Sequence, residues 1–166
     1  MRLQPRHLVL SACTAAALAP AQAAGTVDVS FVNPARFADA GAKDEQANLR
    51  TISEHLRWLG ERHLKSGQVL KIDVLDLDLA GEMRPSRRRI GDVRISKGMA
   101  DWPKISVRYS LQANGQVLRD GVETIGDMSY LQPMADYRNA QPLRHEKQML
   151  DRWFKARFGE QRTGGD

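Results

Sequence analysis

The sequence predicts an α+β domain, a two-layer sandwich in which a mostly antiparallel sheet of about five strands carries two helices on one face. Three observations predict this class: two segments with helical apolar spacing, several segments with strand-like alternation, and one strong hairpin signal. The longest strand-like run, residues 69–82 (VLKIDVLDLDLAGE), is the centre of the predicted sheet. The chain of 166 residues is long enough for one such domain, which we place at residues 24–159.

Residues 1–23 have the composition of a secretory signal peptide and are left out of the predicted domain. Arg2 and Arg6 form a positive start, residues 8–19 are apolar and rich in alanine, and Ala21-Gln22-Ala23 is an A-x-A cleavage site. We therefore expect a periplasmic or secreted protein. Its remaining segments do not reach the ~20 consecutive apolar residues of a membrane-spanning helix.

An alternative is a lipoprotein. Leu10-Ser11-Ala12-Cys13 fits a bacterial lipobox, which would leave Cys13 as a lipidated N-terminus, but only residues 8–12 would then form the apolar region. After cleavage near Ala23 the chain has no cysteine, which excludes a disulfide or a thiolate metal site in the mature protein. Loss of the two arginines also lowers the formal charge from +5 to +3, so the mature chain is only mildly basic.

The first strand is expected at residues 26–32, where apolar and polar side chains alternate. A helix should follow from an N-cap at Asp44 to about residue 65, with Gly67 at its C-cap. Its buried stripe is Leu49, Ile52, Leu56 and Leu59. Trp58 is expected to pack over the edge of that stripe as part of the core rim.

The central run changes phase at Val74 and Leu75, which are both apolar and adjacent. A one-residue slip would turn every later side chain to the other face unless a bulge absorbs it, so we predict a β-bulge here. The bulge places Asp73, Asp76 and Asp78 together on the polar face. The strand–helix–strand order further predicts that the first strand is parallel to this one.

Three interpretations of these aspartates stay open. They can be solvated or paired with nearby arginines, which is the usual environment of Asp. They can frame a divalent cation such as calcium, although their spacing is not that of the D-x-[DN]-x-[DN]-G loop. They can also act as paired carboxylates in acid–base chemistry. We expect no cofactor. If the chain does bind a divalent cation, Asp73, Asp76 and Asp78 are the expected ligands.

Residues 82–89 are predicted to form a loop that contains Arg84, Arg87, Arg88 and Arg89. Such a run can bind a phosphate or an acidic partner, neutralise the preceding aspartates, or remain solvated. We expect no nucleic acid partner, because the protein is predicted to be exported and the run has no stacking aromatic residues.

The remaining strands are predicted from alternation and turn residues. Residues 90–96 are a short strand candidate, and residues 104–112 are a clear strand. Asn114-Gly115 predicts a type I′ hairpin turn. Residues 116–125 should return antiparallel, with a kink at Gly121.

Residues 126–141 form a long segment without periodicity, which we interpret as an ordered loop over one sheet face. Loops of this length are often functional, so Asp127, Tyr130 and Tyr137 are binding candidates together with the arginines above.

The last helix should begin with Pro142 at its first position and end at Gly159, followed by a disordered tail at residues 160–166. Its apolar arc is Leu143, Met149, Leu150, Trp153, Phe154 and Phe158. Glu146 falls within the arc, and we expect it at the rim, bonded to an arginine. The alternative is a buried acid with a functional role.

Several of these features together resemble a known family. They are the run at residues 69–82, the Trp102-Pro103 pair, Gly-Asp-Met-Ser-Tyr at residues 126–130, and Glu-Lys…Leu…Trp-Phe at residues 146–154. The combination resembles a bacterial family of exported proteins, domain of unknown function 3016, over roughly residues 27–158. The resemblance implies a secreted or periplasmic domain of a Gram-negative bacterium, and it assigns no activity and no site residues.

The function we expect is a non-catalytic binding or envelope-accessory module, whose partner is an envelope protein or an anionic ligand. The predicted order of strands and helices is also that of small envelope-accessory domains, which is an analogy of fold alone. The chain contains no H-E-x-x-H, no G-x-S-x-G and no phosphate-binding glycine loop, which lowers the expectation of an enzyme. The alternative is a metal-dependent or carboxylate-based hydrolase that uses Asp73, Asp76 and Asp78.

Overall fold

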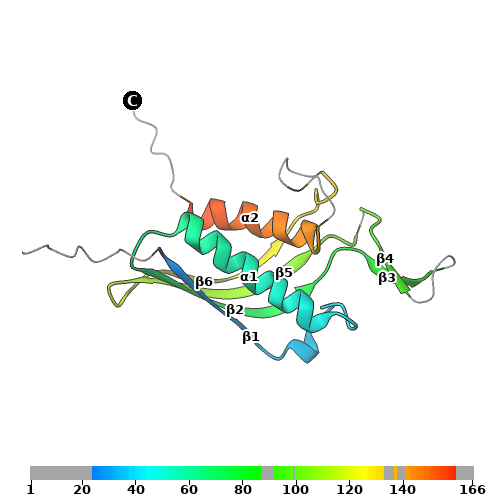
Figure 1. Cartoon of the computed structure of the whole chain (residues 1–166), viewed down its shortest axis with the longest axis horizontal. Helices are drawn as coiled ribbons and strands as arrows, with labels where there is room; N and C mark the ends of the chain where they lie inside the picture. Colours follow the sequence, from blue (N-terminus) through cyan, green and yellow to red (C-terminus); the bar gives the residue numbers. More distant parts are fainter. Residues whose placement is uncertain (1–23, 87–91, 99, 133–136, 138–140, 160–166) are drawn as a thin grey trace, which may run out of the picture.

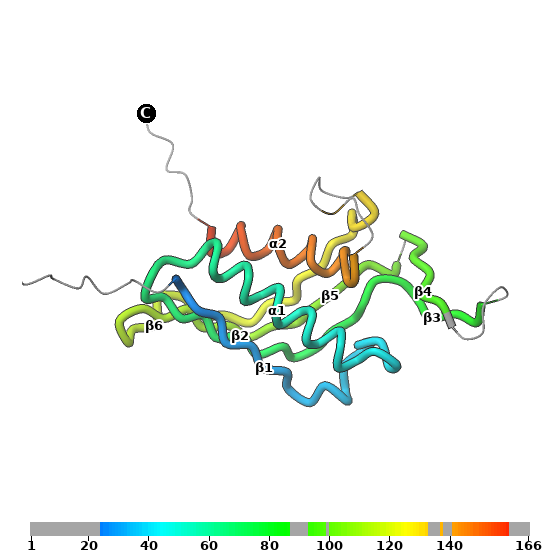
Figure 2. Tube along the Cα trace, in the orientation of Figure 1, coloured from blue at the N-terminus to red at the C-terminus, as the bar shows by residue number. Residues whose placement is uncertain are grey.

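The computed structural model describes residues 24–86, 92–98, 100–132, 137 and 141–159, and it has two layers. A four-stranded sheet is covered on one face by two helices that lie side by side (Figures 1 and 2). The elements in chain order are β1 (Thr26–Phe31), the short 3-10 helix η1 (Pro34–Arg36), α1 (Glu45–His63), β2 (Gln68–Asp78), β3 (Glu82–Pro85), β4 (Asp92–Ile95), β5 (Lys104–Ala113), β6 (Gln116–Gly126) and α2 (Arg144–Phe158). The predicted α+β class is confirmed.

The main sheet has the strand order β1-β2-β5-β6. β1 is parallel to β2, as the crossover through α1 predicts, and the other neighbours are antiparallel. The predicted bulge is confirmed, because Val74 pairs with Val107 while Asp76 pairs with Ser106, which leaves Leu75 as the extra residue. The bulge keeps Val74 and Leu77 both fully buried on either side of the slip.

The core fills the space between the helices and the sheet. α1 packs over β1, and α2 lies beside α1 and reaches over β6. The buried stripe of α1 is Ile52, Leu56 and Leu59, and that of α2 is Met149, Leu150, Trp153 and Phe154. Each of these side chains is at most 8% exposed, and a fully buried aliphatic side chain stabilises the fold by roughly 1.5–3 kcal/mol. This packing holds both helices firmly against the sheet.

The end of α1 differs in detail from the prediction. Asp44 is the N-cap residue, as expected, but the C-cap is Leu64, whose N–H bonds to the carbonyl oxygen of Gly60. Gly67 instead lies just before β2 with φ +76°. It therefore serves the turn into the strand and not the end of the helix, because that turn is where a left-handed residue is required.

The predicted loop at residues 82–89 is wrong in its first half. Glu82–Pro85 form the strand β3, which pairs with β4 in a separate two-stranded sheet. The resulting hairpin projects from the body of the molecule (Figure 1). The predicted strand at residues 90–96 is β4, and its place in this hairpin explains why the main sheet has four strands. The backbone N–H and C=O groups of β3 pair with β4, so this charged segment forms a strand. Its sequence alone does not reveal that pairing.

Arg94 of β4 fixes the root of the hairpin. Its guanidinium donates hydrogen bonds to the carbonyl oxygens of Leu79, Ala80 and Gly81, at 2.8–3.4 Å, and pairs with Asp39 at 2.8 Å. One side chain thus satisfies three consecutive carbonyls where the chain leaves β2. Planar guanidinium donors suit such a convergent set of acceptors.

The β5–β6 hairpin has the predicted turn. Asn114 and Gly115 have φ of 51° and 76°, the pair of positive values that a type I′ turn requires. The irregularity in β6 lies near Leu118, because Leu111 pairs with Arg119 while Gln112 pairs with Val117. The strand pairs regularly through Gly121, so the register shift does not lie at the glycine where a kink is expected.

α2 begins two residues later than predicted. Its N-cap is Leu143, in the left-handed region with φ 52°, so Pro142 lies before the helix and not at its first position. Gly159 is the C-cap, as predicted. Glu146 is 3% exposed and accepts a hydrogen bond from the backbone N–H of Ala80 at 2.8 Å. The expected arginine partner at the rim is wrong, because the chain between β2 and β3 brings a backbone donor to the first turn of α2.

Candidate functional site

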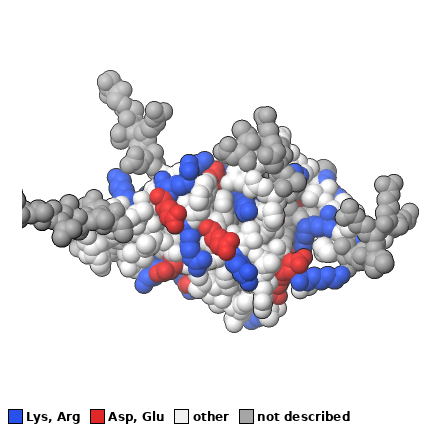
Figure 3. All heavy atoms as spheres, in the orientation of Figure 1, with Lys and Arg blue, Asp and Glu red and all other residues white. Residues whose placement is uncertain are grey.

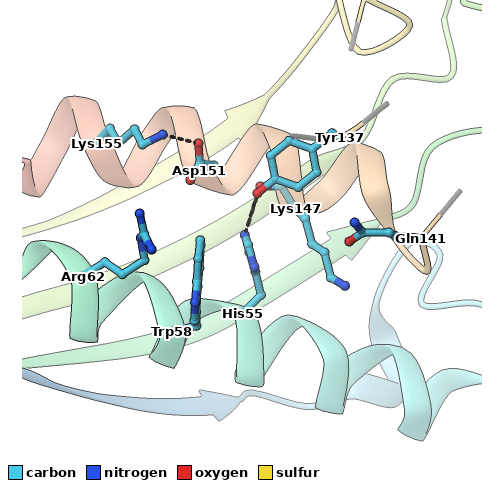
Figure 4. A pocket seen from close by; sticks show the side chains of 8 residues that line it. All are labelled: His55, Trp58, Arg62, Tyr137, Gln141, Lys147, Asp151 and Lys155. Atoms are coloured by element: carbon cyan, nitrogen blue, oxygen red, sulfur yellow. Dashed lines mark hydrogen bonds and ion pairs between the residues drawn. The ribbon is translucent and has the colours of Figure 1, made fainter. Parts of the chain in front are cut away.

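A cleft of about 390 Å³ lies between α1 and α2, on the side of the helices away from the sheet (Figure 4). Both helices and the segment that leads into α2 contribute to it. The lining residues are His55, Trp58 and Arg62 from α1, Lys147, Asp151 and Lys155 from α2, and Tyr137 and Gln141.

Helical spacing places these side chains together. His55, Trp58 and Arg62 recur every three or four residues, beside the buried stripe of α1, so they share one face of the helix. Lys147 and Asp151 repeat the same spacing along α2. Since both helices are packed on the core, the two rows face one another across a fixed gap.

Trp58 occupies the middle of the α1 row, between two other side chains (Figure 4). The imidazole of His55 stacks on the indole at a centroid distance of 5.4 Å and an interplanar angle of 21°. The guanidinium carbon of Arg62 lies 4.7 Å from the indole centroid, within the range of a cation–π contact. The stacking orders Arg62, and Trp58 remains 43% exposed.

His55 links the two helices. Its Nε2 lies 3.2 Å from the carbonyl oxygen of Lys147, and because a carbonyl only accepts, this nitrogen carries the proton. The hydroxyl oxygen of Tyr137 is 3.5 Å from the same nitrogen. Burial lowers the pKa of His55 from 6.5 to about 4, and the bond to the Lys147 carbonyl offsets only part of that effect. At neutral pH the imidazole is therefore uncharged.

The fixed charges of the cleft do not cancel. Asp151 has a side chain that is 5% exposed, and it pairs with Lys155 at 2.7 Å. Arg62 and Lys147 have no carboxylate within ion-pair distance among the residues that the structure describes. Acidic and basic side chains are otherwise interspersed on this face of the molecule (Figure 3). Within the cleft, the excess of positive charge comes from Arg62 and Lys147.

Comparison with known protein families identifies the family of this chain. A family model described as a protein of unknown function (DUF3016) matches residues 25–156. The chain belongs to the DUF3016 family. The resemblance seen in the sequence is thereby confirmed. Searches of curated proteins and of solved structures found no match.

Two of the predicted binding residues of this DUF3016 chain lie away from the cleft. Asp127 is 7% exposed and accepts hydrogen bonds from Arg152 at 2.8 Å and from the N–H of Ser129 at 3.0 Å. Tyr130 is 1% exposed and donates to Asp101 at 2.8 Å. Both residues connect the segment after β6 to its neighbours. Of the loop candidates, Tyr137 is the one that lines the cleft.

The predicted arginines are divided between two parts of the chain. Arg84 lies on β3, where it pairs with Glu82 at 2.7 Å. Arg84, together with Lys97, lowers the pKa of the Glu82 carboxyl. Arg87, Arg88 and Arg89 lie outside the described residues. Their role therefore stays a prediction from the sequence.

The three central aspartates each have a donor of their own. Asp73 accepts from the hydroxyl of Ser30 at 2.6 Å and lies 3.6 Å from Arg108. Asp76 accepts from the N–H of Ala38 at 2.8 Å, and Asp78 pairs with Lys104 at 2.8 Å. Within the described ranges, no group of three or more His, Cys, Asp or Glu residues is arranged to hold a metal ion.

Most of the cleft was missed in the sequence. The sequence predicts Trp58 at the core rim, and it marks neither Arg62 nor Lys147 as a candidate. The spacing of His55, Trp58 and Arg62 could have indicated a second face on α1. Its partner row on α2 could not be recognised, because the sequence does not show which helix faces touch.

Proposed function

We propose that this DUF3016 chain is an exported, non-catalytic binding module whose ligand occupies the cleft between α1 and α2. The observation that carries the proposal is the pair of cations, Arg62 and Lys147, that face the cleft without a carboxylate partner among the described side chains. A cleft with an excess of one charge attracts ligands of the opposite charge. The ligand is therefore anionic.

The rigidity of the site supports binding. Its residues stand on two helices whose opposite faces are buried in the core, with Leu56 and Leu150 both 0% exposed. His55 adds a hydrogen bond between the helices. Sites on rigid elements lose little conformational entropy when a ligand binds.

The chemistry of the cleft also favours binding over acid–base catalysis. A general base is most effective when its pKa lies near the working pH. His55, with a pKa lowered to about 4 by burial, is a weak base, and its Nε2–H is engaged by the Lys147 carbonyl. Asp151 is held by Lys155. His55 and Asp151 are thus both engaged in structural contacts.

Photo-crosslinking inside cells tests the proposal. A benzophenone amino acid is placed at Gln141, an exposed residue of the cleft lining, and as a control at Arg57, an exposed residue of α1 outside it. We expect an adduct from position 141 that is absent from position 57. The adduct should be lost when Arg62 and Lys147 are both changed to Gln. Equal adducts at both positions, or an adduct that survives the double change, would overturn the proposal.

The projecting hairpin supports a second candidate, an accessory role at an envelope protein. β3 and β4 extend beyond the body of the molecule (Figure 1), and the sequence places Arg87, Arg88 and Arg89 between them. Basic residues in the connection between these two strands would suit an acidic partner surface. Changing the three arginines to Ala should weaken capture of that partner without unfolding the domain. Unchanged capture would remove the hairpin from this role.

A further inference from the structure

The positive charge of the cleft is divided between its two ends. α1 and α2 run in the same direction (Figure 1). His55 in the middle of α1 contacts Lys147 in the first turn of α2. Farther along both helices, His63 at the end of α1 lies beside Phe154 of α2, with ring centroids 6.0 Å apart. A given level along α1 therefore corresponds to one level along α2. Lys147 is at the level of His55.

Arg62 lies at the other end. It follows His55 by two turns of α1, which is about 10 Å along the helix axis at ~1.5 Å per residue. Lys155 and Asp151 approach this level from α2, but they neutralise each other. One uncompensated positive charge thus remains at each end of the cleft, Lys147 at the first and Arg62 at the second.

The middle of the cleft is aromatic and uncharged. Trp58 lies between the two ends, and Tyr137 faces His55 across the gap (Figure 4). His55 itself is neutral at physiological pH because burial lowers its pKa to about 4. Such a surface suits the apolar portion of a ligand.

We infer that the cleft selects elongated small molecules that carry two carboxylate-type groups about 10 Å apart, joined by an apolar chain or ring. This inference rests on the proposed function and adds the class of ligand. The planar guanidinium of Arg62, held against Trp58, presents paired donors to one carboxylate. Lys147 binds the other as a point charge. The volume of about 390 Å³ is within the usual range for small-molecule sites.

A length series measures the spacing of the two charges. Succinate, suberate and sebacate are titrated into the mature chain, with octanoate and decanoate as matched ligands that have the same chain length and one carboxylate fewer. Calorimetry gives the affinity, and backbone amide shifts locate the site. We expect the long dicarboxylates to bind about fivefold more tightly than the matched monocarboxylates, the gain of one additional ion pair. Succinate should show no such gain, because it cannot reach both ends.

Two variants assign the gain to the two ends. Arg62→Gln and Lys147→Gln should each reduce suberate binding to the level of octanoate, while Arg57→Gln, on the exposed side of α1, should leave the difference intact. Equal binding of suberate and octanoate by the unmodified chain would overturn the inference. So would a gain that survives both cleft variants. If no dicarboxylate binds although the crosslink at Gln141 forms, the inference fails and the proposed function stands; if both fail, neither stands.

Discussion

The Nε2 of His55 lies 3.2 Å from the carbonyl oxygen of Lys147, so one imidazole joins the middle of α1 to the first turns of α2. The same imidazole stacks on Trp58, so the bond sets the level of Lys147 relative to Trp58 and Arg62. The same contact therefore stabilises the fold and fixes the geometry of the candidate site. Its titration gives the first prediction.

Stability should fall on acidification because of His55. Its pKa is lowered from 6.5 to about 4 in the folded state, so between these values the unfolded chain binds a proton that the folded chain does not. The full contribution is present above pH 6.5 and is lost as the pH falls toward 4, a change of about 3 kcal/mol. Urea unfolding from pH 4 to 8 measures it.

His55→Gln is the control for this prediction, because the amide can still donate to the Lys147 carbonyl but does not titrate. Burial also lowers the pKa values of His63 and His145, so some loss of stability in acid should remain in the variant. A variant with the same pH dependence as the unmodified chain would show that His55 is not responsible.

Glu146 should matter for stability as a hydrogen-bond acceptor. Its Oε1 accepts from the buried backbone N–H of Ala80 at 2.8 Å, and Glu146→Ala leaves that donor without its partner. We expect Glu146→Ala to lower the free energy of unfolding by about 2 kcal/mol. Glu146→Gln, which keeps an acceptor oxygen, should cost less than half as much. Equal losses in the two variants, measured by urea unfolding, would contradict this role.

Gly121 should not tolerate a side chain. A Cβ at this position would lie 3.0 Å from the hydroxyl oxygen of Tyr109 and 3.2–3.3 Å from its ring, so the ring must move. Tyr109 is 4% exposed and bonds to Glu123, which resists that movement. We expect Gly121→Ala to destabilise the fold by about 1–3 kcal/mol. Gly126→Ala on the same strand, with its nearest atom at 3.5 Å, is the matched control and should be near neutral.

Export can be tested on the N-terminus. When the full chain is expressed in a bacterium, we expect the periplasmic protein to begin at Ala24, because Ala21-Gln22-Ala23 forms the cleavage site. Intact mass and N-terminal sequencing measure this, and Ala23→Asp should block processing. Cys13→Ser should have no effect. A lipid-modified N-terminus at Cys13 would instead establish the lipoprotein alternative.

Local sequence signals predicted most of the sheet. The alternation around Val74 and Leu75 indicated the bulge, because a core-facing strand cannot change phase without one. Asn114-Gly115 indicated the tight hairpin, because these residue types accept positive φ. The hairpin of β3 and β4 was only half recognised, since Arg94 and backbone pairing stabilise it in place of an apolar pattern.

For the candidate site, too, the sequence determines one part and the tertiary structure another. The amphipathic spacing of α1 and α2 determined that each helix has a buried face and an exposed face, because the hydrophobic effect acts on each segment separately. The tertiary structure alone decided that the exposed faces form a cleft. The parallel packing of the helices brings Arg62 and Lys147, which are distant in sequence, to opposite ends of one aromatic surface. Contacts between segments depend on how the whole core packs, and no local pattern in the chain contains that information.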